Sequence, residues 1–218
     1  MTSCACCAHR RVASERGDSR GLGGAEQQRL CHALRARHDA VLVGIGTVLA
    51  DDPELTVRLH RGRSPARIVL DSRLRTPPDS RLVRSAGAAP LLIATVSRDQ
   101  SSIEALLSRG AAVWGFEPDS SGRVPLRALF RRLAEEGMLS VLVEGGPTVH
   151  TAILRDGLAD RVAVAIAPLI LGGRNAPAWT RDLGLAGLDE AIELDSMVTR
   201  RVGRDLWIEG PLRGRRDV

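Results

Sequence analysis

One segment of the chain combines glycines, a carboxylate and an arginine in an order that suits a phosphorylated ligand. The apolar run 40–43 leads into the small residues 44–47, and Asp51 and Arg58 follow. Glycines let a ligand approach the backbone, a carboxylate can exchange a proton, and a guanidinium can bind an anion. The segment therefore offers the parts of a site for a phosphorylated substrate. The alternative is structural: a strand, a glycine turn and a solvated Asp-Asp-Pro loop.

Two further glycine pairs follow strand-like runs. Gly145 and Gly146 open a helical pattern, and a second pair stands at 172–173. Backbone N–H groups at such a turn form an anion cradle, helped by the helix dipole. Glu144 lies at the carboxyl end of its strand, where ligands of open α/β sheets usually bind. Together the three turns favour a dinucleotide or phosphorylated ligand, although each alone could be a tight turn.

A fourth strand end carries basic residues. Asp71, Ser72 and Arg73 follow an apolar run, and Arg75 comes two positions later. Arginines there could bind the 2′-phosphate that distinguishes NADP from NAD, or could be solvated loop residues. The chain has no Gly-x-Gly-x-x-Gly fingerprint followed by an acid, and no lysine for a Walker A motif. Neither an ordinary Rossmann domain nor a P-loop is indicated.

Composition limits the class of protein. The 31 basic residues are all arginines and the formal net charge is +5, but aromatic residues make up only 2%. Nucleic-acid surfaces usually interleave basic residues with stacking aromatics, so we expect no nucleic-acid partner. No apolar run approaches the ~20 residues of a membrane span, and no signal peptide is visible. We therefore expect a cytoplasmic protein without membrane contact.

Cysteine and histidine spacing argues against a metal site. The cysteines are Cys4, Cys6, Cys7 and Cys31, which we interpret as reduced thiols of a cytosolic protein. A zinc site is the alternative, but the spacing matches no usual ligand pattern. The histidines, which do not pair at metal-ligand spacing, are expected at the surface or in the core: His9, His32, His38, His60 and His150.

Strand-like and helix-like segments alternate along the chain. This pattern predicts one α/β domain over residues 1–218, with three αβα layers around a mostly parallel, mixed sheet. Helices are expected at 26–37, 103–107 and 125–133. Strands are expected at 40–43, 66–70, 91–96, 111–116, 140–144 and 161–167, with an antiparallel ribbon of 191–200 and 204–210 at the end. Loops are expected at 116–123 and 172–181, and a disordered tail at 211–218.

Taken in order, these motifs resemble the pyrimidine reductases of riboflavin biosynthesis, the family formed by the C-terminal reductase domain of RibD. Each motif alone is unspecific, but the ordered set is specific and covers residues from about 19 to 210. The motifs are the runs 32–35, 39–53, 55–58, 69–72, 74–77, 143–148 and 168–173.

The resemblance implies a dihydrofolate-reductase-like fold, NADPH as the cofactor and a phosphorylated pyrimidine as the substrate. The implied reaction reduces the ribosyl group of 5-amino-6-(5-phosphoribosylamino)uracil, or of its 2,5-diamino analogue, to a ribityl group. It also implies a homodimer whose subunits pair through the ribbon at 191–210.

The resemblance also assigns roles to residues. Asp51 matches the carboxylate beside the reacting sugar, and Glu144 matches a carboxylate near the substrate. Arg35 and Arg58 match the residues that hold the phosphate. The substrate-binding run also includes Leu55 and Thr56. The positions that match the cofactor site are Gly46, Thr47, Val48, Ser72, Arg73, Thr95, Gly145, Gly146 and Thr148.

The chain departs from the family at its start. Members carry a lysine in the first strand, which corresponds to residues 2–8 here, and Ser3 takes its place. Residues 21–24 replace a Trp-Ile-Thr/Ser motif, so a hydroxyl is missing at Gly23. These 218 residues contain neither the His-x-Glu nor the Pro-Cys-x-x-Cys motif of the deaminase half of RibD. Two alternatives follow: a reductase of another pterin- or pyrimidine-like compound, or a ligand-binding homologue with reduced catalysis.

Overall fold

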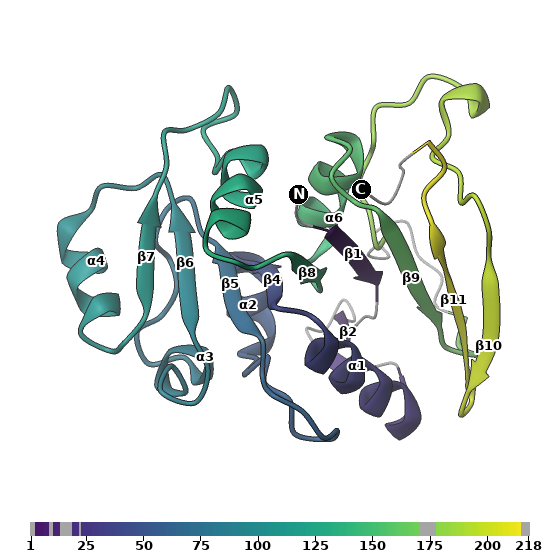
Figure 1. Ribbon diagram of the computed structural model, residues 1–218, viewed down its shortest axis with the longest axis horizontal. Helices are drawn as coiled ribbons and strands as arrows, with labels where there is room; N and C mark the ends of the chain where they lie inside the picture. The colour runs from purple at the N-terminus through teal and green to yellow at the C-terminus, as the bar shows by residue number, and fades with distance from the viewer. Residues whose placement is uncertain (1–2, 9–10, 14–18, 22, 171–177, 215–218) are drawn as a thin grey trace.

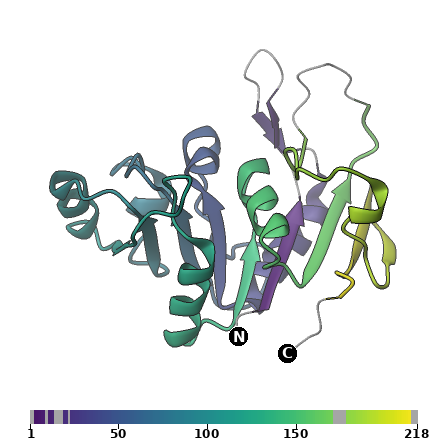
Figure 2. The same cartoon turned by 90° about the horizontal axis from the view of Figure 1, so that it is seen from above.

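The computed structural model describes residues 3–8, 11–13, 19–21, 23–170 and 178–214. Within them a nine-stranded sheet has the order β10-β11-β9-β1-β8-β4-β5-β6-β7 (Figure 1). Its strands are β1 (Ser3–Ala8), β4 (Ala40–Gly44), β5 (Ala66–Leu70), β6 (Leu91–Thr95), β7 (Ala112–Gly115), β8 (Ser140–Val143), β9 (Arg161–Ile166), β10 (Val198–Val202) and β11 (Asp205–Pro211). A separate antiparallel ribbon pairs β2 (Arg11–Ala13) with β3 (Ser19–Gly21), and it projects from the body of the molecule in Figure 2.

The sheet is parallel from β9 to β7 and ends in an antiparallel pair, β11 and β10. This confirms the predicted mixed sheet. The chain runs outward from β4 to β7 and then returns to place β8 between β1 and β4. Because parallel strands share one carboxyl edge, the residues that follow β4, β5, β6 and β8 emerge on the same edge of the sheet.

Helices cover both faces, as expected for three αβα layers (Figure 2). Side chains alternate along β4, so Val41 and Val43 pack toward α2, α3 and α4 while Leu42 packs toward α5 and α6. The helices are α1 (Ala25–Arg37), α2 (Ile45–Asp51), α3 (Arg81–Arg84), α4 (Gln100–Leu107), α5 (Leu126–Glu135) and α6 (Pro147–Arg155), with a 3₁₀ turn η1 (Leu188–Glu190). Among the described residues, none of the helices combines the length and apolar character that crossing a membrane requires.

The structure corrects the sequence prediction at α2. The segment expected to be a glycine turn and an open loop forms a helix directly after β4, and Asp51 is its last residue. Ile45 and Val48 explain the difference, because both side chains are buried in the core cluster on that face of the sheet. Burial of two apolar side chains outweighs the low helix propensity of Gly46.

The C-terminal ribbon is also shorter at its start than predicted. Its first strand begins at Val198 rather than at residue 191. Two residues of the expected tail are ordered, because Pro211 ends β11 and Leu212 is buried and bridges to Leu194, whereas residues 215–218 lie outside the described residues. The expected glycine pair at 172–173 lies outside the described residues.

Asp39 joins the starts of β4 and β8. Its carboxylate accepts hydrogen bonds from the Ser140 hydroxyl (2.8 Å) and from the N–H groups of Ser140 (2.9 Å) and Leu139 (3.1 Å). Burial raises the pKa of Asp39, but these hydrogen bonds, with Arg63 nearby, outweigh burial and hold the pKa below its usual value. A depressed pKa in the folded state contributes stability that is present above the unfolded pKa and lost as the pH falls.

We predict that Asp39→Asn lowers the free energy of unfolding by about 1–3 kcal/mol at pH 7, because it weakens hydrogen bonds to a charged acceptor. The variant should also lose less stability than the wild type between pH 5 and pH 3. Urea unfolding across this pH range measures both effects. Parallel pH curves for the two proteins would show that Asp39 is not the group that titrates.

Candidate active site

A buried ion pair lies at the centre of the candidate site. Arg35 of α1 donates from Nε to Glu144 Oε1 (2.8 Å) and from Nη2 to Glu144 Oε2 (2.6 Å), although the two residues are 109 positions apart. Their side chains are 11% and 2% exposed. Arg35 Nη1 also donates to the carbonyl oxygen of Thr56 (3.2 Å). Arg35 therefore connects the end of β8 to the segment expected to bind the substrate.

His32 makes a second connection between α1 and that segment. Its Nδ1 accepts a hydrogen bond from the backbone N–H of Arg58 (2.9 Å). His32 and Arg35 are three residues apart on the helix, so they present their side chains to the same neighbour. The sequence analysis missed this role, although the three-residue spacing of the two side chains was a usable signal.

The segment 54–58 is held from several sides. Glu54 forms an ion pair with Arg58 and another with Arg81 of α3. The hydrogen bond from Arg81, followed by the charge of Arg58, keeps the pKa of Glu54 below its usual value despite partial burial. Arg58 Nη1 also donates to Thr56 Oγ1 (2.7 Å), and its side chain is 48% exposed. Arg58 thus combines a fixed position with access to solvent.

A buried arginine supports the same segment from inside. Arg67 of β5 has no exposed surface and donates from Nη1 to the carbonyl oxygens of Glu54 and Leu82, both at 3.2 Å. It also donates to Ser85 Oγ at 2.7 Å. Burial lowers the pKa of Arg67 to about 10, with the charge of Glu54 acting in the opposite direction. The guanidinium remains charged at neutral pH and ties the segment to α3.

Asp51 and Asp52 have different environments at the end of α2. Asp51 is half-buried in the last turn. Asp52 adopts the left-handed conformation (φ 38°), and its Oδ1 accepts a hydrogen bond from the N–H of Arg81 (2.8 Å). The carboxylate of Asp52 therefore satisfies the start of α3.

The glycine turns at the ends of β4 and β8 meet at the starts of α2 and α6. A Cβ on Gly44 or Gly145 would lie 2.8 Å from Val149 of α6, so close packing requires glycine at both positions. A Cβ on Gly146 would lie 3.8 Å from Thr47 Oγ1, which places the two helix starts beside each other. Gly46 is exposed, with no atom within 4 Å of an added Cβ.

Neither helix start has a side-chain cap. The first backbone N–H groups of a helix have no partner within the helix, and the helix dipole favours an anion there. Two adjacent uncapped starts beside an open glycine surface suit a diphosphate. This part of the site fits the predicted dinucleotide at Gly46, Thr47, Gly145 and Gly146.

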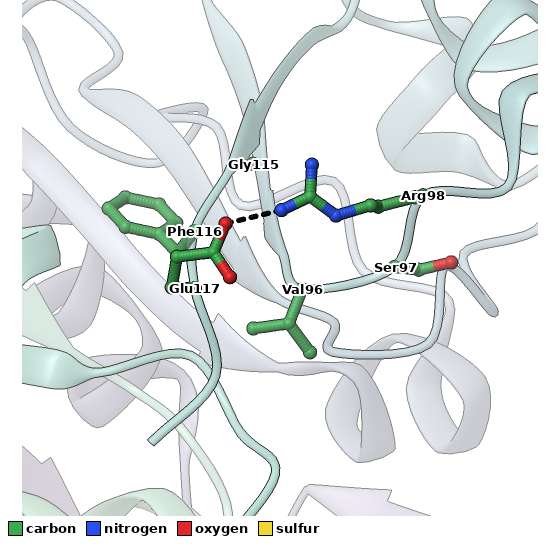
Figure 3. Close-up of a pocket in the computed structure, with 6 residues that line it drawn as sticks. All are labelled: Val96, Ser97, Arg98, Gly115, Phe116 and Glu117. Carbon is green, nitrogen blue, oxygen red and sulfur yellow. Dashed lines mark hydrogen bonds and ion pairs between the residues drawn. The ribbon is translucent and has the colours of Figure 1, made fainter.

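The expected cofactor residues on β5 and β6 lie farther along the same edge. Ser72 Oγ accepts a hydrogen bond from Val124 N–H (3.3 Å), and Thr95 is fully buried, with Oγ1 accepting from Ser97 N–H (3.0 Å). Arg73 is exposed, as is Arg75. Beside them a depression of about 250 Å³ opens at the ends of β6 and β7 (Figure 3). Its lining residues, among which Arg98 and Glu117 form an ion pair, are Val96, Ser97, Arg98, Gly115, Phe116 and Glu117.

Three expected site residues are engaged elsewhere. Val48 and Leu55 are 2% and 3% exposed and pack in the core, so their side chains do not line an open surface. Thr148 Oγ1 accepts a hydrogen bond from Arg181 Nε (2.9 Å). The sequence did not indicate the contacts of Arg181 with Thr148 or of Arg81 with Glu54, because neither arginine stands near a glycine turn in the chain.

Comparison with solved structures defines the fold class. The structure superposes on Acinetobacter baumannii RibD with a TM-score of 0.81 at 23% identity, covering 97% of this chain and 58% of that chain. It superposes on dihydrofolate reductase from Enterococcus faecalis with a TM-score of 0.50 at 10% identity, covering 97% of this chain and 96% of that chain. The protein therefore has the dihydrofolate-reductase-like fold, as predicted.

The chain belongs to the RibD C-terminal domain family, whose model matches residues 11–208. It is 37% identical over 210 residues to the 2,5-diamino-6-ribosylamino-4(3H)-pyrimidinone 5′-phosphate reductase of Methanothermobacter thermautotrophicus, covering 94% of this chain and 93% of that protein. Relatives named RibD are longer, and the chain spans about half of their length, 53% in one case.

We predict that Arg35→Gln lowers the free energy of unfolding by about 3–5 kcal/mol, because it leaves the carboxylate of Glu144 buried without its charged partner. Urea unfolding measures the loss. Arg29→Gln is the matched control on the same helix, since Arg29 pairs with Glu26 at the surface, where such pairs contribute about 0–1 kcal/mol. Equal losses for the two variants would contradict the central role of the buried pair.

Proposed function

We propose that this protein is an NADPH-dependent reductase that converts the ribosylamino group of a phosphorylated pyrimidine into a ribitylamino group in riboflavin biosynthesis. The substrate is 5-amino-6-(5-phosphoribosylamino)uracil or its 2,5-diamino analogue, and the reaction takes place in the cytoplasm. Family membership and the name of the archaeal relative support the proposal. The observation that carries it is the contact of Arg35 with both Glu144 and Thr56, which joins an anion-binding segment to a cofactor-type glycine turn.

The residues present fit a nicotinamide dinucleotide. Gly46 leaves open space, Gly146 faces Thr47, and the starts of α2 and α6 have no side-chain cap. NADPH, when bound, supplies the hydride for the reduction. We propose NADPH rather than NADH because exposed arginines, Arg73 and Arg75, follow β5 at the same edge and can pair with a 2′-phosphate.

Arg35 and the segment 54–58 suit the substrate. Arg58 presents an exposed guanidinium, and Arg35 reaches the same segment through its hydrogen bond to the carbonyl oxygen of Thr56. These groups can hold a phosphate by charge-assisted hydrogen bonds. Opening the ribosyl ring requires a proton at the ring oxygen, and Asp51 at the end of α2 is our candidate donor. A substrate fixed at its phosphate presents its sugar in a defined orientation.

The test of the proposal is NADPH oxidation by the purified protein with the phosphorylated pyrimidine. We predict turnover with NADPH, and less with NADH. Arg58→Ala should raise the substrate KM roughly ten- to a hundredfold while leaving the KM of NADPH unchanged, since one charge-assisted phosphate contact is lost. Arg61→Ala, an exposed arginine of the same loop, is the control. Absence of turnover by the wild type with either ring form would contradict the proposed function.

We predict that Asp51→Asn lowers kcat by about 10²–10⁴-fold, the usual contribution of a positioned acid or base. The affinity for NADPH should remain, because the cofactor surface is formed by the glycine turns. Asp52→Asn is the control, since Asp52 contacts the start of α3. Steady-state kinetics on the two variants decides the assignment, and a larger loss of kcat in Asp52→Asn than in Asp51→Asn would reverse it.

We also propose that the protein is a homodimer that pairs through its C-terminal region. Among the described residues, nine of the thirteen exposed large apolar side chains lie between Ile166 and Leu206. Contiguous exposed apolar surface is typical of an interface, and we infer that these side chains contribute to one. Met197 and Val198, 62% and 55% exposed, lie at or beside the edge strand β10.

Light scattering at micromolar concentration should therefore give twice the 23.4 kDa mass of one chain. Met197→Glu with Val198→Glu should shift the protein toward the monomer, because two charges would be buried in the interface. Leu107→Glu, at an exposed position on α4, should leave the mass unchanged. A monomeric wild type would contradict the proposed dimer.

A further inference from the structure

Gln27 is a buried polar residue without a visible structural purpose. It lies in the first turns of α1 and is only 6% exposed. No hydrogen bond joins its carboxamide to another residue in the part of the chain that the structure describes, and its amide atoms are not among the fully buried polar atoms that lack a partner. A carboxamide that is mostly buried but keeps some access at its polar end can exchange that access for hydrogen bonds to a ligand.

The carboxamide of Gln27 fills the space where a side chain on Gly23 would lie. A Cβ added to Gly23 would lie 0.9 Å from Gln27 Oε1 and 2.1 Å from Cδ. Any side chain at position 23 would therefore collide with the carboxamide. The glycine is needed here for space, and the polar end of Gln27 stands where a side chain from position 23 would begin.

The position of Gln27 on α1 relates it to the candidate site. Gln27, Cys31 and Arg35 are spaced by four residues, so they lie along one face of the helix, and all three are largely buried. The eight residue steps from Gln27 to Arg35 span about 12 Å along the axis. The start of the helix is fixed by a hydrogen bond from Gly24 N–H to Asp205 Oδ2 (2.9 Å).

Arg35 and His32 hold the anion-binding segment 54–58 near the other end of this face. A ligand that places its phosphate there, and extends along α1, brings its far end to Gln27. In a phosphoribosylamino-pyrimidine the far end is the pyrimidine ring. A carboxamide offers one acceptor and a donor side by side, which matches the N–H and C=O groups on the edge of a pyrimidinone.

We propose that the carboxamide of Gln27 binds the hydrogen-bonding edge of the pyrimidine ring and so contributes to substrate specificity. This inference rests on the proposed function and adds a ring-binding residue to it. The carboxamide of Gln27 then occupies the space beside Gly23 where another residue at position 23 would place its side chain.

Steady-state kinetics with Gln27→Ala tests the inference. The KM of the complete substrate should rise about tenfold, as expected for the loss of neutral hydrogen bonds, while the KM of NADPH stays unchanged. Ribose 5-phosphate has the sugar and phosphate of the substrate but no pyrimidine ring, so it should inhibit the wild type and the variant with the same Ki. Gln28→Ala, at an exposed position in the same helical turn, should behave as the wild type.

Gln27→Glu keeps the size of the side chain and removes its donor, so it should also raise the substrate KM and gives a second variant if Gln27→Ala folds poorly. An unchanged substrate KM in both Gln27 variants would overturn the inference. So would a parallel rise in the Ki of ribose 5-phosphate or in the KM of NADPH, since either shows a general structural effect. A wild type that reduces no pyrimidine substrate would instead refute the proposed function, and the inference with it.

Discussion

The buried ion pair between Arg35 and Glu144 is the contact on which the arrangement of the site depends. Two charges in a low-dielectric position are costly to desolvate unless their hydrogen bonds are well formed. Here both carboxylate oxygens are bound, and a third donor of the guanidinium reaches Thr56. Helix α1, the end of β8 and the segment 54–58 are thereby held in one geometry. The groups proposed for catalysis and binding occupy fixed positions because this pair cannot shift without exposing a buried charge.

Two separate physical reasons explain why glycine occupies its positions in the candidate site. Gly44 and Gly145 are small because α6 packs closely on the ends of β4 and β8 through Val149. Gly46 has open space above it and is available to a ligand. The close packing at the first two positions brings the uncapped starts of α2 and α6 together, and the open surface lies beside them. The packing at Gly44 and Gly145 therefore places the two helix starts so that a ligand could bind over Gly46.

Much of the fold could be predicted from local patterns, because the central strands are short apolar runs such as Ala40–Gly44 that are buried on both sides. Helix α2 could not, since two glycines near its start resemble a turn and its stability comes from burial of Ile45 and Val48. The start of β10 depends on which residues find partners in β11, which no local pattern specifies.

For the candidate site, residue type and resemblance proposed Arg35, Arg58, Asp51 and Glu144, but the pairing of Arg35 with Glu144 spans 109 positions and depends on the fold. The contact of His32 with Arg58 was signalled only by its three-residue spacing from Arg35, and the position of Gln27 against Gly23 depends on neighbours in space that the sequence does not specify. A local sequence pattern can indicate the residues at glycine turns, whereas the residues that position them are recognised only from contacts between distant parts of the chain.

The measurement that tests the central claim most directly is the transfer of an isotopic label. The protein is incubated with NADPH that carries deuterium at the transferable position of the nicotinamide, together with the phosphoribosylamino-pyrimidine, and the product is analysed by mass spectrometry. If one site holds the cofactor at the glycine turns and the sugar beside Glu144 and Asp51, the ribityl product carries the deuterium at C1, the former anomeric carbon of the ribosyl group. Consumption of the cofactor without deuterium in the product, or no reduced product at all, would contradict the account.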